Sequence, residues 1–331
     1  MGSIGHPVCT KRFPLNNGGT IPAVGLGTWQ GKAGTDNAEE LHNSIVYALR
    51  AGYRLIDTAQ LYEVESIVGS AIRASGVPRS EITVVTKFWG EWHHDPAAAL
   101  EKSLRELDID YIDIFLMHWP WATSPDGKKV IAPDESPTFI ETWKAMEKLV
   151  GEKCRAIGVS NFSQKTLEAL LREAKIVPVV NQVELHALNP CLNLVPYCES
   201  KGIRVMSWST MGGGGLHSPI AREVLTNKLF TDIAAKHHCS VGVVSLSWAV
   251  QRGIIVIPKS SSRERIDTNI RLVTLTDEEM NAINNAQHTI GKFRIADHIK
   301  FMQREFRGKK TLMGWTPEDF GWEDSQGNWL T

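Results

Sequence analysis

The chain has 331 residues, 42% of them hydrophobic, and its 36 Lys and Arg nearly balance its 37 Asp and Glu, for a formal charge of −1. Such a balance, without a basic stripe, argues against nucleic acid or an anionic membrane surface as the main partner. The hydrophobic share can build a large core, and α/β barrels commonly reach this length as one domain.

The first predicted element is a hairpin. In FPLNNGGTIPAV, the stretch Asn17-Gly18-Gly19 separates two short extended segments, as in tight β-turns. Short apolar runs, which we predict to be strands, then follow at 24–27, 54–57, 82–86, 112–117, 156–160, 179–183, 204–209 and 254–258. Helical patterns lie between and after them, at 37–51, 66–74, 96–107, 137–149, 163–174, 193–201, 229–237, 241–251 and 263–269.

This alternation predicts the fold class. Eight β-rich runs separated by helices indicate parallel strands with crossover helices, and eight strands close a barrel whose interior side chains just fill it. An open doubly wound sheet is the alternative, but VGLGTWQG lacks the G-x-G-x-x-G spacing of its phosphate loop. We therefore predict an α/β protein, a single-domain (β/α)8 TIM barrel over residues 13–290 with an N-terminal β-hairpin.

The last residues, 291–331, differ in character and predict a long irregular tail near the active-site mouth. Trp315, Trp322 and Trp329 recur every seven residues, but Pro317 and two glycines break any helix that would align them. We expect the tail to fold onto the barrel.

The cysteines and the N-terminus bear on location. The five cysteines are Cys9, Cys154, Cys191, Cys198 and Cys239. Their odd number and lack of CxxC or Cys/His metal spacing favour reduced thiols and no metal site. MGSIGHPVCT lacks the apolar core of a signal peptide and the myristoylation pattern, and no apolar run is long enough to span a bilayer. We expect a soluble, cytoplasmic protein.

Polar residues end most of the predicted strands, where barrel enzymes carry their chemistry. They are Asp57, Lys87, His118, Ser160, Asn161, Gln182, Trp208, Lys259 and Ser260, with Tyr62 one loop after Asp57. Taken singly, each has an ordinary explanation, such as a helix cap, a solvated lysine or a half-buried tyrosine. Together, four ionisable groups after three consecutive strands predict one active site.

Their chemistry is complementary. A tyrosine hydroxyl has an ordinary pKa of about 10, too high for easy proton transfer near neutrality. The ammonium of Lys87 would lower the pKa of Tyr62, Asp57 would hold Lys87, and His118 would orient a carbonyl or share the proton path. This arrangement suits proton donation to a carbonyl oxygen while a hydride reaches its carbon, so a nicotinamide is required.

The remaining rim residues fit a dinucleotide. Ser160, Asn161 and Gln182 could hold a carboxamide, and Trp208 offers a flat face to a ring. PKSSSRERIDTN gathers Lys and Arg residues at the start of a helix, which is typical either of phosphate binding or of a solvated basic turn.

Seven motifs in order carry a family resemblance: VGLGTW, RLIDTAQLY, TKFW, LMHWP, AIGVSNF, NQVELH and IPKSSSRERIDTNI. From about residue 13 to residue 269 the chain resembles the aldo-keto reductases. The resemblance implies reversible, NADPH-dependent reduction of an aldehyde or ketone to an alcohol. It places the catalytic tetrad on Asp57, Tyr62, Lys87 and His118, with Tyr62 as the proton donor. Basic residues at the 2′-phosphate position favour NADPH/NADP+ over NADH.

The resemblance also implies two further sets of residues. The cofactor set is Gly27, Thr28, Trp29, Asp57, Ser160, Asn161, Gln182, Trp208, Ser209, Met211, Lys259, Ser260, Ser261, Arg265, Thr268 and Asn269. The substrate pocket is Trp29, Leu61, Trp89, His118, Trp119 and Trp121. Large flat side chains suit aromatic or hydrophobic carbonyls, while small aldoses, glycerol and glyceraldehyde also fit this chemistry.

The sequence departs from the family pattern at several places. Trp208 stands where relatives usually carry Tyr, and Thr268 where they often carry Glu or Gln. After Tyr62 only Glu65 of an Asn-Glu pair is kept. STMGGGGLHSP replaces a longer loop, and its four glycines predict a looser cover and faster cofactor release.

Three other functions remain open. The same site could serve an alditol or glycerol NADP+ dehydrogenase. Lys87 could instead form a Schiff base in a lyase, or the barrel could be a non-catalytic NADPH-binding subunit that leaves Tyr62 unused. In each case we expect a monomer that acts on a small molecule, without a nucleic-acid or membrane partner.

Overall fold

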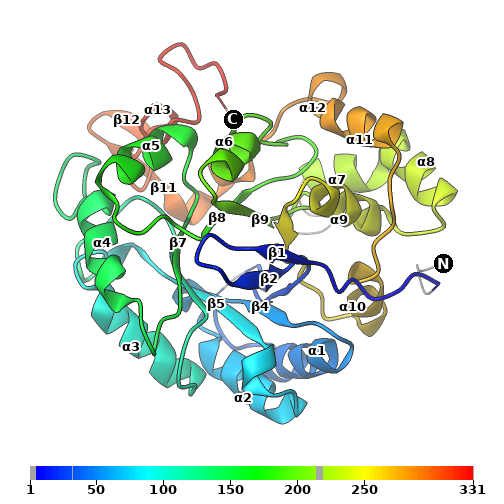
Figure 1. The fold of residues 1–331 in the computed structure, drawn as a ribbon. Helices are drawn as coiled ribbons and strands as arrows, with labels where there is room; N and C mark the ends of the chain where they lie inside the picture. The colour runs from blue at the N-terminus through cyan, green and yellow to red at the C-terminus, as the bar shows by residue number, and fades with distance from the viewer. Residues whose placement is uncertain (1–4, 32, 214–218, 331) are drawn as a thin grey trace.

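The structure, a computed structural model, describes residues 5–31, 33–213 and 219–330. Its centre is a parallel sheet with the strand order β10-β9-β8-β7-β6-β5-β4-β3. A parallel bridge joins Val24, just before β3, to Val256 in β10, and Gly25 N donates to Val256 O at 2.8 Å. The sheet therefore closes on itself, with the helices arranged around it (Figure 1), and the predicted (β/α)8 barrel is confirmed.

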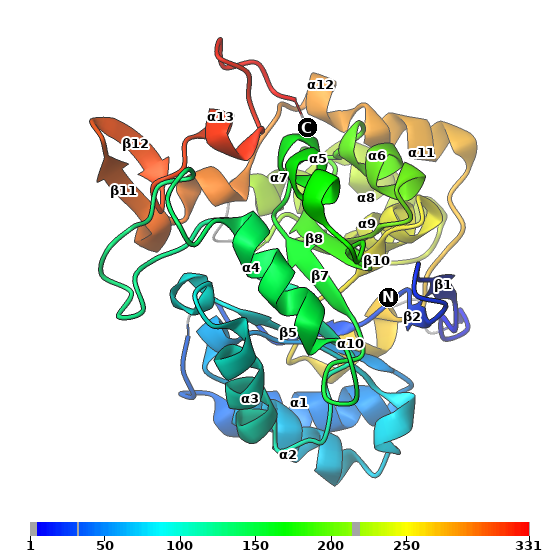
Figure 2. The same cartoon turned by 60° about the vertical axis from the view of Figure 1, so that its left-hand side comes forward.

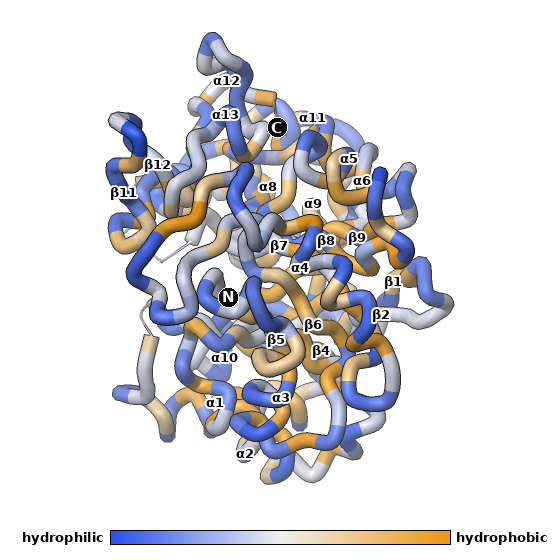
Figure 3. The backbone as a smooth tube through the Cα atoms, turned by 90° about the vertical axis from the view of Figure 1, so that its left-hand side faces the viewer, coloured by the Kyte–Doolittle hydropathy of each residue, from blue (hydrophilic) through white to orange (hydrophobic). Residues whose placement is uncertain are grey.

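The eight barrel strands coincide with the eight predicted runs. They are β3 (Leu26–Gly27), β4 (Leu55–Asp57), β5 (Thr83–Phe88), β6 (Ile114–Met117), β7 (Ile157–Ser160), β8 (Val180–Glu184), β9 (Arg204–Trp208) and β10 (Ile255–Val256). Most are buried along their whole length, because helices cover the outside and side chains fill the inside. The hydrophobic stretches of the chain accordingly gather around β4, β6 and β8 (Figure 3).

The predicted hairpin is also present. β1 (Arg12–Pro14) pairs antiparallel with β2 (Thr20–Pro22), and Figure 1 shows it lying across one end of the barrel. Phe13 and Ile21 are buried there, so the hairpin closes this end against solvent.

Nine helices match the predicted patterns. They are α1 (Ala38–Arg50), α2 (Glu65–Ser75), α3 (Pro96–Leu107), α4 (Phe139–Met146), α5 (Gln164–Glu173), α6 (Leu194–Ser200), α8 (Lys228–Lys236), α9 (Val241–Gln251) and α10 (Arg263–Asn269). Side-chain caps set the starts of several of them: Asp95 accepts from Ala98 N before α3, and Thr138 and Ser163 form capping boxes before α4 and α5. The sequence patterns did not predict α7 (Pro219–Thr226), α11 (Asp277–Asn284) or α12 (Ala286–Thr289).

The tail is less irregular than predicted. β11 (Gln303–Phe306) and β12 (Lys309–Leu312) form an antiparallel hairpin, and α13 (Pro317–Phe320) follows. Figure 2 shows this unit beside the long loop that leads into α4, and Arg307 forms ion pairs with Asp134 and Glu135 of that loop. The tail is therefore a folded addition to the barrel.

The five cysteines form no disulfide in the described part of the chain. Cys154, Cys191 and Cys198 are buried, and burial raises the pKa of each thiol to about 12. Within the described ranges, no helix has the length and apolar character needed to cross a membrane. The same residues contain no cluster of three His, Cys, Asp or Glu side chains placed to hold a metal ion.

Candidate active site

The four ionisable groups predicted to act together meet at one end of the barrel. Asp57 ends β4, Lys87 lies near the end of β5, His118 follows β6, and Tyr62 ends a short 3-10 helix, η1 (Gln60–Tyr62). Lys87 Nζ donates to Asp57 Oδ1 at 2.8 Å and lies 3.5 Å from the Tyr62 hydroxyl. The side chains of Asp57 and Lys87 are buried, so the charge of this pair is held out of bulk water.

Lys87 and His118, the two side chains that could carry a positive charge, differ in protonation state. Burial lowers the pKa of Lys87, but the charge of Asp57 and its hydrogen bond outweigh that effect, so the pKa lies above its ordinary value and Lys87 is an ammonium. Burial and the charge of Lys87 both hold the pKa of His118 well below its usual range. His118 is therefore a neutral imidazole, and its ring centre lies 5.9 Å from that of Tyr62.

The pKa of Tyr62 corrects one expectation. Burial raises it, the charge of Lys87 lowers it, and the net pKa lies above the ordinary value. The reason is that a buried phenolate loses more hydration than one ammonium, already paired with Asp57, can offset. In this structure Tyr62 is accordingly a protonated hydroxyl near neutrality, the form that can donate a proton.

The turn that carries Tyr62 is anchored at both ends by buried polar side chains. Gln60 Nε2 donates to Ser103 Oγ at 2.9 Å, and Thr86 Oγ1 donates to Glu65 Oε1 at 2.7 Å. The Gln60 bond ties the turn to α3, and the Glu65 bond ties the residues after it to Thr86, which precedes Lys87 on β5. Sequence reasoning missed Gln60, although a glutamine inside RLIDTAQLY was a visible signal.

The predicted carboxamide-binding residues lie beside the tetrad and are bonded to it. Gln182 Nε2 donates to Asp57 Oδ2 at 2.7 Å. Ser160 Oγ donates to Gln182 O at 2.7 Å, and Asn161 Nδ2 donates to His118 O at 2.9 Å. The ends of β7 and β8 are thus coupled to the catalytic strands by direct hydrogen bonds.

The predicted cofactor residues on and just after β3, the first barrel strand in the chain, also lie at the end of the barrel that carries Tyr62. Thr28 Oγ1 donates to Asp57 O at 3.0 Å, and the ring centres of Trp29 and Tyr62 are 5.0 Å apart. A Cβ on Gly27 would lie 2.7 Å from Ile257 O, so only glycine fits where β3 meets the end of β10.

The predicted phosphate site is compact. Ser260 Oγ accepts from Ser262 N at 3.1 Å and from Arg265 Nε at 3.2 Å, which brings the Arg265 guanidinium next to the start of α10. Burial lowers the pKa of Lys259, Glu40 opposes this, and the charge of Arg265 adds to it. Two basic side chains close enough to repel fit an anion between them, while Ser261 is half-buried beside them.

The last predicted cofactor residues lie at the ends of β9 and α10. Ser209 has a left-handed φ of 56°, and Met211 and Asn269 both face Gly242, where a Cβ would lie 2.8 Å from Met211 Sδ. Thr268 is buried on α10. Of the predicted short glycine loop, Gly214 and Gly215 lie outside the described residues, so the hypothesis of a looser cover stays a prediction.

The predicted pocket residues separate into two layers. Trp29, Leu61 and Trp89 are partly exposed, and Trp89 lies edge-on to His118 at 4.9 Å. Trp121 differs from the prediction because it is fully buried and packs edge-on behind Trp89 at 4.8 Å. It supports the pocket and does not line it.

The same tryptophan layer extends into the tail. Trp119 is also nearly buried and packs against Trp322 at 6.1 Å. Phe301, which sequence reasoning missed, is 52% exposed and lies 6.4 Å from the ring of Trp89. The tail therefore adds an aromatic side chain to the rim of the pocket.

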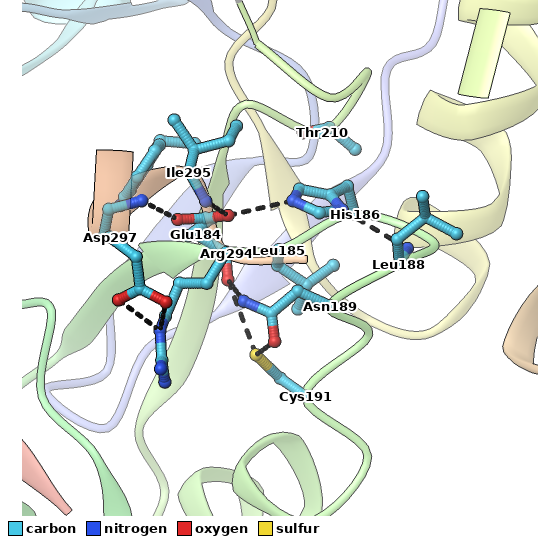
Figure 4. A network of polar contacts seen from close by, with 12 residues as sticks. Glu184, Leu185, His186, Leu188, Asn189, Cys191, Thr210, Arg294, Ile295 and Asp297 are labelled. Carbon is cyan, nitrogen blue, oxygen red and sulfur yellow. Dashed lines mark hydrogen bonds and ion pairs between the residues drawn. The ribbon is translucent and has the colours of Figure 1, made fainter. Parts of the chain in front are cut away.

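A buried carboxylate at the end of β8 holds the tail against the barrel (Figure 4). Glu184 accepts from Ile295 N at 2.6 Å and from Ala296 N at 2.9 Å, and its Oε1 lies 2.9 Å from His186 Nε2. Glu184 lies within NQVELH, but the two tail amides that it accepts from are more than 100 residues away, so no local pattern indicated this role.

Arg294, next to these amides, contacts several residues of the tail and holds them together. Its Nε donates to both Asp297 oxygens at 3.0 Å, and it pairs with Glu323. Its guanidinium lies 4.6 Å from the ring centres of both Trp322 and Trp329. A small cleft is lined by Arg294, Glu184 and Trp208.

Comparisons with known proteins show what the chain is similar to. A family model described as "Aldo/keto reductase family" matches residues 23–288. A glycerol 2-dehydrogenase (NADP(+)) of Saccharomyces cerevisiae is 41% identical over 304 residues, which cover 86% of this chain and 94% of that protein. An aldehyde reductase of the same yeast is 39% identical, over 86% of this chain and 93% of its own length. The crystal structure of a Bombyx mori aldo-keto reductase in complex with NADP has 38% identity and a TM-score of 0.78, covering 88% of this chain and 97% of that one.

Proposed function

The chain belongs to the aldo/keto reductase family, and from this premise we propose which residues act in its NADP(H)-dependent reduction of an aldehyde or ketone to an alcohol. One observation carries the proposal: the Lys87 ammonium lies 2.8 Å from Asp57 and 3.5 Å from the Tyr62 hydroxyl, at the end of the barrel where the strands lead into loops. An ammonium beside a protonated phenol is the pair that carbonyl reduction needs.

In this proposal Tyr62 gives its proton to the carbonyl oxygen. NADPH, when bound, supplies the hydride. Lys87 stabilises the phenolate that remains, and Asp57 keeps Lys87 charged and in place. His118, as a neutral imidazole, donates a hydrogen bond to the carbonyl oxygen without adding a second positive charge. In alcohol oxidation the same tyrosine acts as the base.

We assign the cofactor to the remaining rim residues. Ser160, Asn161 and Gln182 would hold the carboxamide, and Trp208 would stack on the ring. Lys259, Ser260 and Arg265 would hold the 2′-phosphate, for which their clustered positive charge is suited. The names of the yeast glycerol 2-dehydrogenase and of the Bombyx mori complex, which both include NADP, support this cofactor.

The favoured substrates are aromatic or hydrophobic aldehydes and ketones, because Trp29, Trp89 and Phe301 present flat apolar surface at the mouth. Oxidation of glycerol or another alditol is the second candidate, favoured by 41% identity to a glycerol 2-dehydrogenase. A panel of carbonyls and alcohols, each assayed with NADPH/NADP+ and NADH/NAD+, distinguishes the two.

The Tyr62→Phe variant tests the assignment. It should bind NADPH as the wild type does and lose reduction, because only the transferable proton is removed. Tyr111→Phe is the matched control, since that ring lies between Arg79 and Arg155 away from the site. A Tyr62→Phe enzyme with wild-type turnover would contradict the proposal, and borohydride trapping of substrate on Lys87 would favour a lyase.

We further propose a single-domain, cytoplasmic monomer that acts without a nucleic-acid or membrane partner. Its unpaired cysteines support a reducing compartment. The exposed large hydrophobic side chains of the described residues are few and scattered along the sequence, for example Val150, Leu192 and Phe301, which supports a monomer. Sedimentation velocity at micromolar concentration tests the oligomeric state.

A further inference from the structure

Trp208 makes a hydrogen bond across the rim. Its Nε1 donates to Asn161 Oδ1 at 2.9 Å. Trp208 ends β9 and Asn161 follows β7, with β8 lying between these strands in the sheet. The bond therefore joins two parts of the site that backbone pairing does not connect.

Both N–H groups of the Asn161 side chain are engaged by protein partners. Its Nδ2 donates to His118 O at 2.9 Å and to Ser160 Oγ at 3.1 Å. Its Oδ1 accepts from Trp208 and keeps a second lone pair, and the bonds to His118 O and from Trp208 agree on which end of the amide is oxygen. The residue is buried and its φ is 64°, a left-handed conformation that asparagine tolerates.

The Trp208 ring is held by two kinds of contact. Trp208 is half-buried, packs against the hydrophobic core and borders a small cleft that Glu184 and Arg294 also line. The bond to Asn161 adds a directional restraint that apolar packing does not supply.

We propose that Trp208 is a positioning residue: its indole N–H restrains the Asn161 amide in the orientation in which it donates to His118 O, and through Asn161 it steadies the strand end that bears His118. This goes beyond stacking, because phenylalanine or tyrosine would keep a flat ring without an N–H at that point. The inference rests on the proposed function for its effect on NADPH, but the bond itself is testable in the cofactor-free protein.

The first test is spectroscopic. In cofactor-free wild type, the side-chain amide protons of Asn161, followed by ¹⁵N–¹H NMR and assigned with Asn161→Asp, should be dispersed and slow to exchange. Trp208→Phe should shift them and speed their exchange at least severalfold. Unchanged Asn161 signals in Trp208→Phe would overturn the proposal, whether or not NADPH binds.

The second test is calorimetric titration with NADPH. Trp208→Phe should weaken binding on the order of fivefold, the effect of one neutral hydrogen bond. To remove the effect of ring size, 3-benzothienylalanine at position 208 keeps two fused rings without the N–H and should weaken binding similarly. Wild-type affinity of that variant would overturn the proposal, whereas failure of wild type to bind NADPH would instead refute the proposed function.

A double-mutant cycle and a matched control complete the design. In an Asn161→Ala background, replacing Trp208 by the N–H-free analogue should have almost no further effect on NADPH affinity, whereas an additive effect would overturn the coupling. Trp248 makes the same kind of bond, Nε1 to Asn284 Oδ1 at 2.8 Å, and is fully buried between α9 and α11. Trp248→Phe should leave both NADPH affinity and the Asn161 signals unchanged.

Discussion

The two halves of the barrel rim are built differently. On the arc formed by β4, β5 and β6, the Asp57–Lys87 ion pair is buried and bonded within the barrel itself. On the arc formed by β7, β8 and β9, neutral amides face the site, and the buried carboxylate of Glu184 reaches outward to the tail. The first arc holds the charges that we propose to react, and the second anchors the tail, so changes in the two arcs should affect different measurements.

The largest expected effect is on the first arc. Lys87→Met should slow carbonyl reduction on the order of 10³-fold, because Tyr62 loses the ammonium that stabilises its phenolate. It should also lower the free energy of unfolding by ~3–5 kcal/mol, since Asp57 is left buried and unpaired. Steady-state NADPH oxidation and urea unfolding measure the two effects.

Lys144→Met is the control, because the Lys144–Glu173 pair is exposed and contributes at most ~1 kcal/mol. An Lys87→Met enzyme with near-wild-type turnover would mean that the ammonium does not assist Tyr62, and the contrast between the arcs would be lost.

On the second arc, Glu184→Leu should release the tail without removing the reaction. The variant loses the acceptor for two backbone N–H groups, so we expect ~2–3 kcal/mol lower stability. Limited proteolysis with mass spectrometry should show new cleavage between residues 292 and 310, and KM for bulky aldehydes should rise more than kcat falls. The exposed Glu199→Leu should show none of these effects; an equal loss of kcat and kcat/KM in Glu184→Leu would place it with the catalytic residues.

A buried histidine beside the first arc predicts that the folding stability decreases at acid pH. Burial lowers the pKa of His93, whose ring packs against Phe88 at the end of β5, to about 3, while the unfolded chain has an ordinary pKa of about 6.5. Between these values the unfolded state binds more protons, so stability is present above about pH 6.5 and falls as pH drops, by at most ~1.4 kcal/mol per pH unit. His93→Gln should flatten the unfolding free energy against pH in this range, and the exposed His94→Gln should not.

The smallest expected effect concerns the mouth of the substrate pocket. Phe301→Ala should lower kcat/KM for aromatic aldehydes about threefold to tenfold, because it removes exposed apolar surface next to Trp89. Glyceraldehyde, which is too small to reach this side chain, should be reduced unchanged. Equal losses for both substrates would show that Phe301 supports the fold of the tail and not the choice of substrate.

The sequence predicted the first arc of the rim better than the second, and the reason is physical. The strands and the tetrad were predictable because parallel strands bring their carboxyl ends to one rim, so residues such as Asp57 and Lys87 are placed by chain order alone. The net pKa of Tyr62 could not be predicted, because it depends on how much water the folded barrel removes from the hydroxyl. The role of Glu184 could not be predicted either, since its bonds to Ile295 and Ala296 connect segments that share no local pattern.

The way the chain ends has a practical consequence. Leu330 N donates to Trp322 O at 2.9 Å, and the ring of Trp329 contacts the Arg294 guanidinium, so residues 322–330 are part of the folded tail. A purification tag or fluorescent fusion attached after Thr331 would pull on the segment that holds Arg294. The same addition before Gly5 would extend from the stretch leading into the hairpin (Figure 2) and is the better choice for assays of substrate preference.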